Sequence, residues 1–215
     1  MTNGSRAKKD LVVLVADADT REAMRALLRR HHTLAIRPII FDIFEHDDRD
    51  PGCLGRADGY LRPLMDRYAY ALVMFDRHGC GSTRSAPDIE ADVRSTLERS
   101  GWQGRCEVVV FAPELEAWVW SPSRSVAECL EWPPRKPELR EWLEQQELWN
   151  PADAKPTDPK AAVERVRREV GKRRSPRLYG LLGERVTTRG CTDPSFNRFC
   201  EILRRWFPII EEENQ

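Results

Sequence analysis

The apolar residues in the first half of the chain form short continuous runs, and the segments between the runs have helical spacing. Runs typical of strands buried on both faces cover residues 11–16, 36–44, 70–75 and 106–112. Segments with apolar positions three and four apart, as in amphipathic helices, cover residues 21–30, 56–67 and 87–99. This alternation predicts an α/β fold with a mainly parallel, Rossmann-like sheet and flanking helices.

After residue 113 the strand pattern stops, and the chain reads as helices separated by prolines. Helical spacing recurs over residues 114–120, 123–130, 137–148, 159–170, 176–185 and 194–206. We therefore expect an α/β domain over residues 10–121 and a helical C-terminal region over residues 122–210 that packs on it. Within that region the stretch NPADAKPTD, residues 150–158, has the proline-rich and polar composition of a linker.

Composition narrows the classes of partner. Thirty-five Lys and Arg balance thirty-five Asp and Glu, so overall charge favours neither nucleic acid nor an anionic membrane. The sequence has no apolar run of the roughly 18 residues that a membrane helix needs and no apolar segment of a secretory signal near its start. Six cysteines at wide spacing are typical of reduced thiols. We expect a cytoplasmic protein that does not associate with membranes.

Acidic residues follow all four predicted strands. They are Asp17 and Asp19, then Asp47, Asp48 and Asp50, then Asp76, and finally Glu114 and Glu116. Because the carboxyl ends of parallel strands meet at one edge of a sheet, these groups should converge, and they repel one another unless cations lie among them. Hard oxygen ligands favour Mg²⁺ or Mn²⁺.

Structural roles for the same residues stay open. Asp17 or Asp19 fits a helix N-cap, and Glu114 and Glu116 fit the first turn of a helix. The stretch HDDRDPGCLG, residues 46–55, is expected to be a loop and fits a solvated turn.

Asp76 has the strongest functional signal, because it ends an apolar strand and runs into the glycine-rich segment RHGCG. His78 and Cys80 in that segment could form a nucleophile pair, but no residue is evident to orient the base. The sequence lacks GxSxG, GxxxxGK[ST] and a GxGxxG after its first strand. These absences disfavour nucleophile-elbow hydrolases, P-loop ATPases and dinucleotide-binding proteins.

Several segments together resemble Toprim-like domains of bacterial anti-phage defence proteins. The segments are VADADTREAM, DPGC, ALVMFDRHGCG, PELEAWVW and CTDPSF. Over residues 10–121 the chain is similar to nuclease domains of the overcoming-lysogenization-defect type. Over nearly its whole length it looks like a Toprim-like component of methylation-associated defence systems.

The resemblance implies a metal site for phosphodiester hydrolysis. In Toprim domains a Glu after the first strand and an Asp-x-Asp after the third hold divalent metal. Here Asp17, one methylene shorter, stands for the Glu, Asp76 stands for the first Asp, and His78 replaces the second. The expected catalytic residues are Asp17, Asp76, His78, Glu114 and Glu116. The expected ligands of Mg²⁺ or Mn²⁺ are Asp17, Asp19, Asp76, Glu114 and Glu116.

Basic residues concentrate in one C-terminal segment. Between residues 160 and 177, eight Lys and Arg stand against two Glu, a local surplus that suits a phosphate backbone and equally a solvated helix face. The expected nucleic-acid contacts are Lys160, Arg167, Lys172, Arg173 and Arg174.

The sequence thus predicts a metal-dependent nuclease of a bacterial anti-phage defence system, acting on DNA or another nucleic acid beside an ATPase partner. One alternative is a non-catalytic interaction module with a degenerate Toprim fold, which would use tryptophans partly as a contact surface. Another is a small phosphotransferase or phosphatase.

Overall fold

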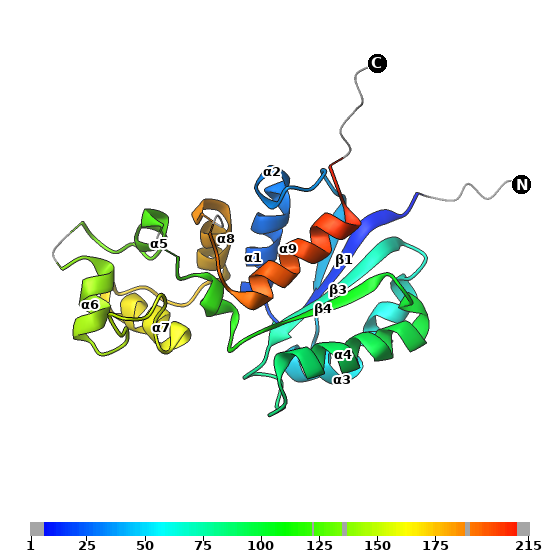
Figure 1. Ribbon diagram of the computed structural model, residues 1–215, viewed down its shortest axis with the longest axis horizontal. Coiled ribbons are helices and arrows are strands. Elements are labelled where there is room, and N and C mark those ends of the chain that lie inside the picture. Colours follow the sequence, from blue (N-terminus) through cyan, green and yellow to red (C-terminus); the bar gives the residue numbers. More distant parts are fainter. Residues whose placement is uncertain (1–6, 122, 135–136, 188–189, 210–215) are drawn as a thin grey trace, which may run out of the picture.

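The computed structural model describes residues 7–121, 123–134, 137–187 and 190–209, and it contains one parallel sheet (Figure 1). The strands are β1 (Lys9–Val15), β2 (Phe41–Glu45), β3 (Tyr68–Asp76) and β4 (Cys106–Phe111). Their order across the sheet is β2-β1-β3-β4, and all three pairings are parallel. The predicted α/β class with a parallel sheet is therefore confirmed.

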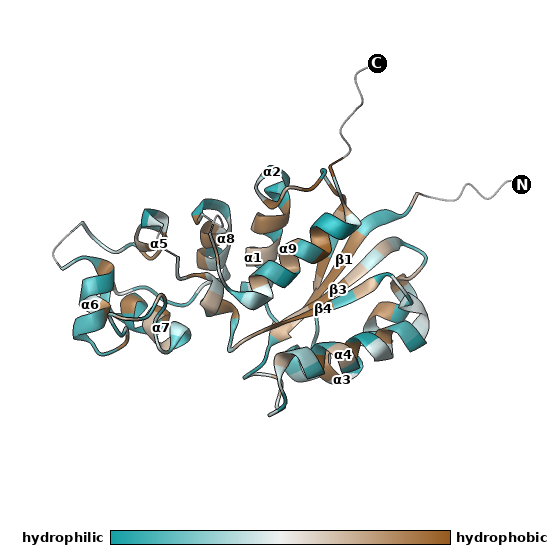
Figure 2. Cartoon of the chain, in the orientation of Figure 1, coloured by the Kyte–Doolittle hydropathy of each residue, from teal (hydrophilic) through white to brown (hydrophobic). Residues whose placement is uncertain are grey.

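Helices cover both faces of the sheet, as Figure 1 shows. One face carries α3 (Arg49–Leu61) and α4 (Ala86–Leu97), and the other carries α1 (Ala18–Arg29) and α9 (Pro194–Trp206). Alternate residues of β1 serve the two layers: Val12 and Leu14 belong to the α3/α4 core, whereas Leu11 and Val13 belong to the opposite one. In Figure 2 the strands are accordingly hydrophobic over much of their length, with hydrophilic residues at the start of β1, while the helices carry hydrophobic and hydrophilic stretches side by side.

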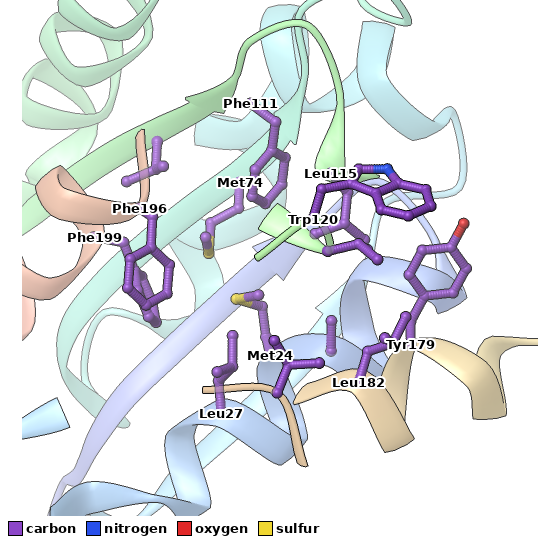
Figure 3. Close-up of a cluster of buried hydrophobic side chains, with 14 of the residues drawn as sticks. Met24, Leu27, Met74, Phe111, Leu115, Trp120, Tyr179, Leu182, Phe196 and Phe199 are labelled. Carbon is purple, nitrogen blue, oxygen red and sulfur yellow. The ribbon is translucent and has the colours of Figure 1, made fainter. Parts of the chain in front are cut away.

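The C-terminal region shares a core with the sheet. It contains α5 (Arg124–Cys129), α6 (Leu139–Gln145), α7 (Pro159–Glu169), α8 (Pro176–Arg185) and α9. Figure 3 shows Leu182 of α8 and Phe199 of α9 in one cluster with Leu27 of α1 and Phe111 of β4. None of the helices in the described ranges combines the length and apolarity that a membrane crossing requires.

The loop predicted over residues 46–55 is wrong, because α3 begins at Arg49. Pro51 lies in the first turn of this helix, where a missing backbone N–H leaves no hydrogen bond unmade. Gly52 packs against the ring of His46, and a Cβ at that position would overlap the ring. Proline and glycine are common in turns, but here Pro51 lies in the first turn of a helix and Gly52 allows a close contact with His46.

Two other elements differ from their predicted extents because of contacts with distant segments. The second strand begins at Phe41 rather than at residue 36, and the backbone N–H of Arg37 instead donates to the carbonyl of Phe207. The expected helix over 114–120 is a 3-10 turn at Leu115–Trp118. The predicted linker at 150–158 is mostly exposed, but Lys155 within it is anchored, since its Nζ donates to the carbonyl of Ala117 at 2.7 Å.

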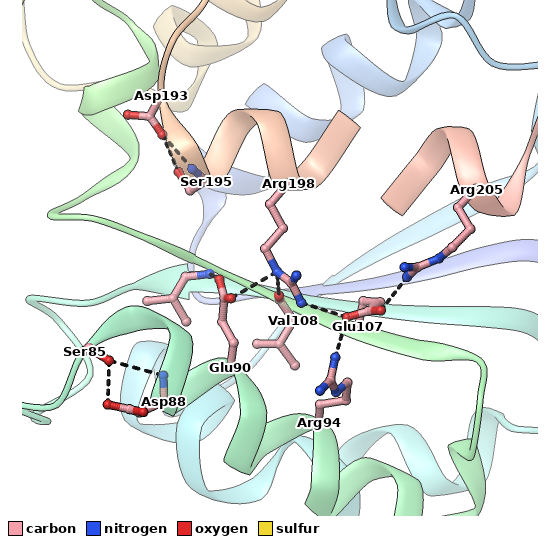
Figure 4. Close-up of polar contacts among 11 residues, drawn as sticks. Ser85, Asp88, Glu90, Arg94, Glu107, Val108, Asp193, Ser195, Arg198 and Arg205 are labelled. Atoms are coloured by element: carbon pink, nitrogen blue, oxygen red, sulfur yellow. Dashed lines mark hydrogen bonds and ion pairs between the residues drawn. The ribbon is translucent and has the colours of Figure 1, made fainter. Parts of the chain in front are cut away.

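Side chains from both helical layers contact the outer edge of β4 (Figure 4). Glu90 of α4 accepts from the backbone N–H of Val110 at 2.9 Å, and Arg198 of α9 donates to the carbonyl of Val108 at 3.4 Å. Arg198 also pairs with Glu90 at 3.0 Å and with the buried Glu107 at 2.9 Å. These charged side chains therefore occupy part of this edge and hydrogen-bond two of its outward-facing backbone groups.

The contact between α8 and α1 depends on a missing side chain. A Cβ on Gly183 would lie 2.8 Å from the carbonyl oxygen of Ala23 and 2.9 Å from Cβ of Ala26. We predict that Gly183→Ala lowers the free energy of unfolding by about 1–3 kcal/mol, because the helices must separate. Urea denaturation measures the change.

Gly180 is the matched control, because it lies on the same helix and its Cβ would make ordinary contacts with Glu22, 3.7 Å from Cβ and 4.0 Å from the carbonyl oxygen. Gly180→Ala should leave stability unchanged or raise it by up to about 1 kcal/mol through helix propensity. Equal effects of the two substitutions would contradict the close approach.

Candidate functional site

The candidate site lies at the carboxyl edge of the sheet. From β1 the chain crosses to β2 on one side, and β3 lies on the other. In open parallel sheets, the point at which strand order reverses is where ligands bind. Asp17 follows β1 at this point, and Asp76 is the last residue of β3.

Asp76 ties three segments together. Its Oδ1 accepts from the backbone N–H of Leu115 at 2.9 Å, and its own N–H donates to Oδ1 of Asp50 at 2.8 Å. The end of β3, the start of α3 and the turn after β4 therefore meet at one residue. Burial, followed by the charges of Asp50, Glu116 and Asp17, raises the pKa of Asp76 well above its ordinary value.

Asp17 has two roles. Its carboxylate accepts from the backbone N–H of Thr20 at 2.8 Å and so caps α1. Its charge also raises the pKa values of Asp76 and Asp50, in each case after the larger effect of burial. The capping alternative is thus confirmed, and it coexists with membership of the acidic cluster.

Glu116 is the most enclosed of these carboxylates, with 2% of its surface exposed. Its Oε1 accepts from the hydroxyl of Tyr179 at 2.6 Å. Burial raises the pKa of Glu116, and the Tyr179 hydrogen bond opposes that shift. Tyr179 comes from α8, so the C-terminal region contributes directly to the site. We call Asp17, Asp50, Asp76 and Glu116 the carboxylate cluster.

Lys160 brings a positive charge to the cluster. Its Nζ lies 2.7 Å from Oε1 of Glu114, and its side chain remains 36% exposed. Burial lowers the pKa of Lys160, but Glu114, Glu116 and Asp76 raise it by more, so the ammonium form is favoured. The predicted residue Glu114 therefore lies beside the cluster with a counter-ion already bound.

Asp19, one of the predicted metal ligands, has a basic partner in the structure. It is buried and pairs with Arg174, with an Nη2 to Oδ2 distance of 2.6 Å. Asp19 thus has its own counter-ion, and Arg174 is engaged in this pair although its side chain remains 45% exposed. His78 has an exposed side chain, and its backbone N–H donates to the carbonyl of Pro113 at 3.3 Å.

Most of the predicted nucleic-acid contacts are likewise engaged in ion pairs. Arg167 is buried, with Nη1 2.6 Å from Glu164, which removes it from the surface. Lys172 pairs with the exposed Glu131 at 2.7 Å. Of the five predicted contacts, Arg173 is exposed and has no carboxylate partner among the described residues. Much of the local surplus of positive charge is therefore balanced within the fold.

The cluster suits a hard cation by its chemistry. Buried carboxylates that raise one another's pKa are stabilised by a divalent ion. Within the described ranges, no three His, Cys, Asp or Glu side chains lie close enough, in their present rotamers, to hold one ion. Mg²⁺ usually keeps several waters and binds through one or two carboxylates and substrate phosphates, so a complete protein cage is not required.

Asp50 and Tyr179 were not among the expected site residues. Asp50 belongs to the acidic group after the second strand. The following Pro51 is typical of a first helical turn, so the sequence did contain a signal that Asp50 lies at a helix start close to the strand ends. For Tyr179 the sequence offers no such signal, because its partner is 63 residues away. Comparisons with protein-family models, curated proteins and solved structures found no match.

The repulsion within the cluster predicts that Asp76→Asn stabilises the metal-free protein. The amide can still accept from the N–H of Leu115, while the buried charge is lost. Because the pKa of Asp76 is raised above 3.8, the ionised form destabilises the fold as pH rises through and beyond that value. At about pH 7.5 we expect a gain of roughly 1 kcal/mol or more in the free energy of unfolding.

Urea denaturation in the presence of a chelator, at several pH values, measures this effect. The difference between Asp76→Asn and wild type should shrink towards acid pH, where Asp76 is protonated in both folded and unfolded chains. A variant that is less stable at every pH would contradict the repulsion.

Neighbouring arginines provide a second test. Arg174→Ala leaves the buried Asp19 without its counter-ion and should lower the free energy of unfolding by about 1–2 kcal/mol at neutral pH. Arg173→Ala, at the adjacent exposed position, should change it by less than about 0.5 kcal/mol. Thermal or urea unfolding of the two variants decides the matter, and similar losses would argue against the Asp19–Arg174 pair.

Proposed function

We propose that the carboxylate cluster binds Mg²⁺ or Mn²⁺ and that the protein hydrolyses phosphodiester bonds in nucleic acid. The observation that carries this proposal is the convergence of Asp17, Asp50, Asp76 and Glu116 at the switch point of the sheet, where the other three raise the pKa of Asp76 and Asp17 raises that of Asp50, in each case after burial. A fold that places several like charges together at its ligand-binding edge is destabilised unless a cation joins them. Perturbed carboxylates of this kind are typical of functional sites.

Each residue has a role that follows from its contacts. Asp76 and one or both of its neighbours Asp17 and Glu116 would hold the ion, with water and substrate phosphate completing its shell. Asp50 positions Asp76 through the backbone N–H of Asp76, and Tyr179 positions Glu116. A bound divalent cation supplies charge neutralisation at the substrate phosphate and a lowered pKa for the attacking water.

Lys160 is the proposed phosphate contact, since its partly exposed ammonium can exchange Glu114 for a substrate oxygen. Arg173 adds an exposed positive charge on the following segment. His78 is exposed in the segment after β3, and a part for it in proton transfer belongs to the proposal. The resemblance to Toprim-like defence proteins supports nucleic acid as the substrate, an ATPase partner and a cytoplasmic setting.

The non-catalytic alternative has less support. It would use tryptophans as a contact surface, but Trp120, Trp132, Trp142 and Trp149 are each at most 8% exposed and pack within the core. A purely structural module also gives no reason to keep together carboxylates such as Asp76, Asp50 and Glu116, whose pKa values are raised. We therefore do not propose this function.

The test is cleavage of plasmid and single-stranded DNA by the purified protein with Mg²⁺ or Mn²⁺. We expect Asp76→Asn to lower the rate by at least about 100-fold, because a charged group at the reacting centre is lost. Lys160→Met should weaken substrate binding while leaving metal binding intact. Metal binding is followed separately by calorimetry and by the rise in thermal stability that a bound ion produces.

Asp47→Asn is the matched control, since Asp47 is an exposed carboxylate that follows the neighbouring strand. Its cleavage rate should equal that of wild type. Cleavage of bis(p-nitrophenyl) phosphate but not of DNA would assign a small phosphodiester substrate. Equal DNA cleavage by wild type and Asp76→Asn, or no metal binding by wild type, would overturn the proposed site.

A further inference from the structure

The two edges of the sheet differ in how their backbone groups are satisfied. At β4, Glu90 and Arg198 hydrogen-bond two of the outward-facing groups, the N–H of Val110 and the carbonyl of Val108 (Figure 4). At β2, the register with β1 turns the backbone groups of the even-numbered residues toward β1. The carbonyl of Ile40 accepts from the N–H of Leu11, and the N–H of His46 donates to the carbonyl of Val15. The N–H and C=O groups of residues 41, 43 and 45 therefore point outward, and no described residue pairs with them.

The surface beside this open edge is hollowed and combines exposed apolar residues with basic ones. Ile40 is 64% exposed, which is the largest value among the large hydrophobic residues of the described chain. A surface hollow of about 460 Å³ runs along the strand, lined by Arg25 and Arg29 of α1 and by residues 39–44. Open apolar edges attract further strands, and proteins normally cover them.

We propose that β2 pairs antiparallel with β2 of a second copy of this chain, about a two-fold axis at Ile43. In this register Ile43 faces Ile43 of the second copy, and Phe41 faces Glu45 of the second copy. Residues 41, 43 and 45 are those whose backbone groups point outward, so the pairing satisfies every one of them. A two-fold axis makes the interface self-complementary and extends the sheet to eight strands.

Charge favours a second copy over an unrelated strand. Phe41 and Ile43 pack on the same side of the sheet as α1, where Arg29 lines the hollow. Glu45 pairs with Arg21 of its own chain, and the register brings it opposite Phe41 of the second copy, beside the hollow that Arg29 lines. Each interface would contain this opposite-charge contact twice, once on each side of the axis.

The test is the oligomeric state of the full chain, by light scattering and sedimentation over about a hundredfold range of concentration. We expect a dimer for wild type. Ile43→Lys places two like charges opposite each other and should weaken dimerisation at least about tenfold. A wild-type chain that stays monomeric throughout would overturn the proposal and leave the edge to a different partner.

Cysteine variants test the register without adding charge. Ile43→Cys should yield a covalent dimer under mild oxidation, because residue 43 faces itself across the axis. Phe41→Cys, two residues away on the same side of the strand, should not link to itself, because it faces residue 45. A dimer that links through Cys at 41, or that survives Ile43→Lys and does not link at 43, would contradict this register.

Discussion

The carboxylate of Asp76 is the point on which the arrangement of the sheet edge depends. It accepts from the N–H of Leu115, while the N–H of the same residue donates to Asp50. Three segments that are distant in sequence are thereby joined next to a negative charge that burial and its neighbours disfavour. The hydrophobic layers on either side must supply the free energy that keeps these like charges together.

The C-terminal region takes part in that task and is not an appendage. Its helices bury apolar side chains against α1 and the sheet, as Figure 3 shows for Leu182 and Phe199. The same helices bring Tyr179 to Glu116 and Lys160 to Glu114. Packing and site chemistry are therefore coupled, because a shift of α7 or α8 would change the electrostatics of the carboxylate cluster.

The two edges of the sheet show a similar coupling between charge and topology. At β4 a buried glutamate, Glu107, pairs with Arg94, Arg198 and Arg205, and charged side chains occupy part of the edge. At β2 the outward-facing backbone groups have no hydrogen-bond partner among the described residues. Charged side chains along an edge disfavour the addition of a strand, so the sheet is better suited to extension at β2 than at β4.

Local pattern was sufficient for most of the elements. The apolar runs of β1, β3 and β4 and the proline-started helices α8 and α9 have clear periodicity, and the structure contains them at nearly the expected residues. The placement of acidic residues after parallel strands also indicated where the cluster would lie, since all parallel strands end at one edge.

Only the tertiary structure decided which side chains pair with one another. Sequence spacing could not show that Asp19 would meet Arg174, that Arg167 would be buried beside Glu164, or that Tyr179 would reach Glu116. It also misjudged residues 46–55, where proline and glycine serve a helix start and so place Asp50 beside Asp76. The physical reason is range: periodicity reports which face of an element is buried, whereas ion pairs and pKa values depend on segments that only the folded chain brings together.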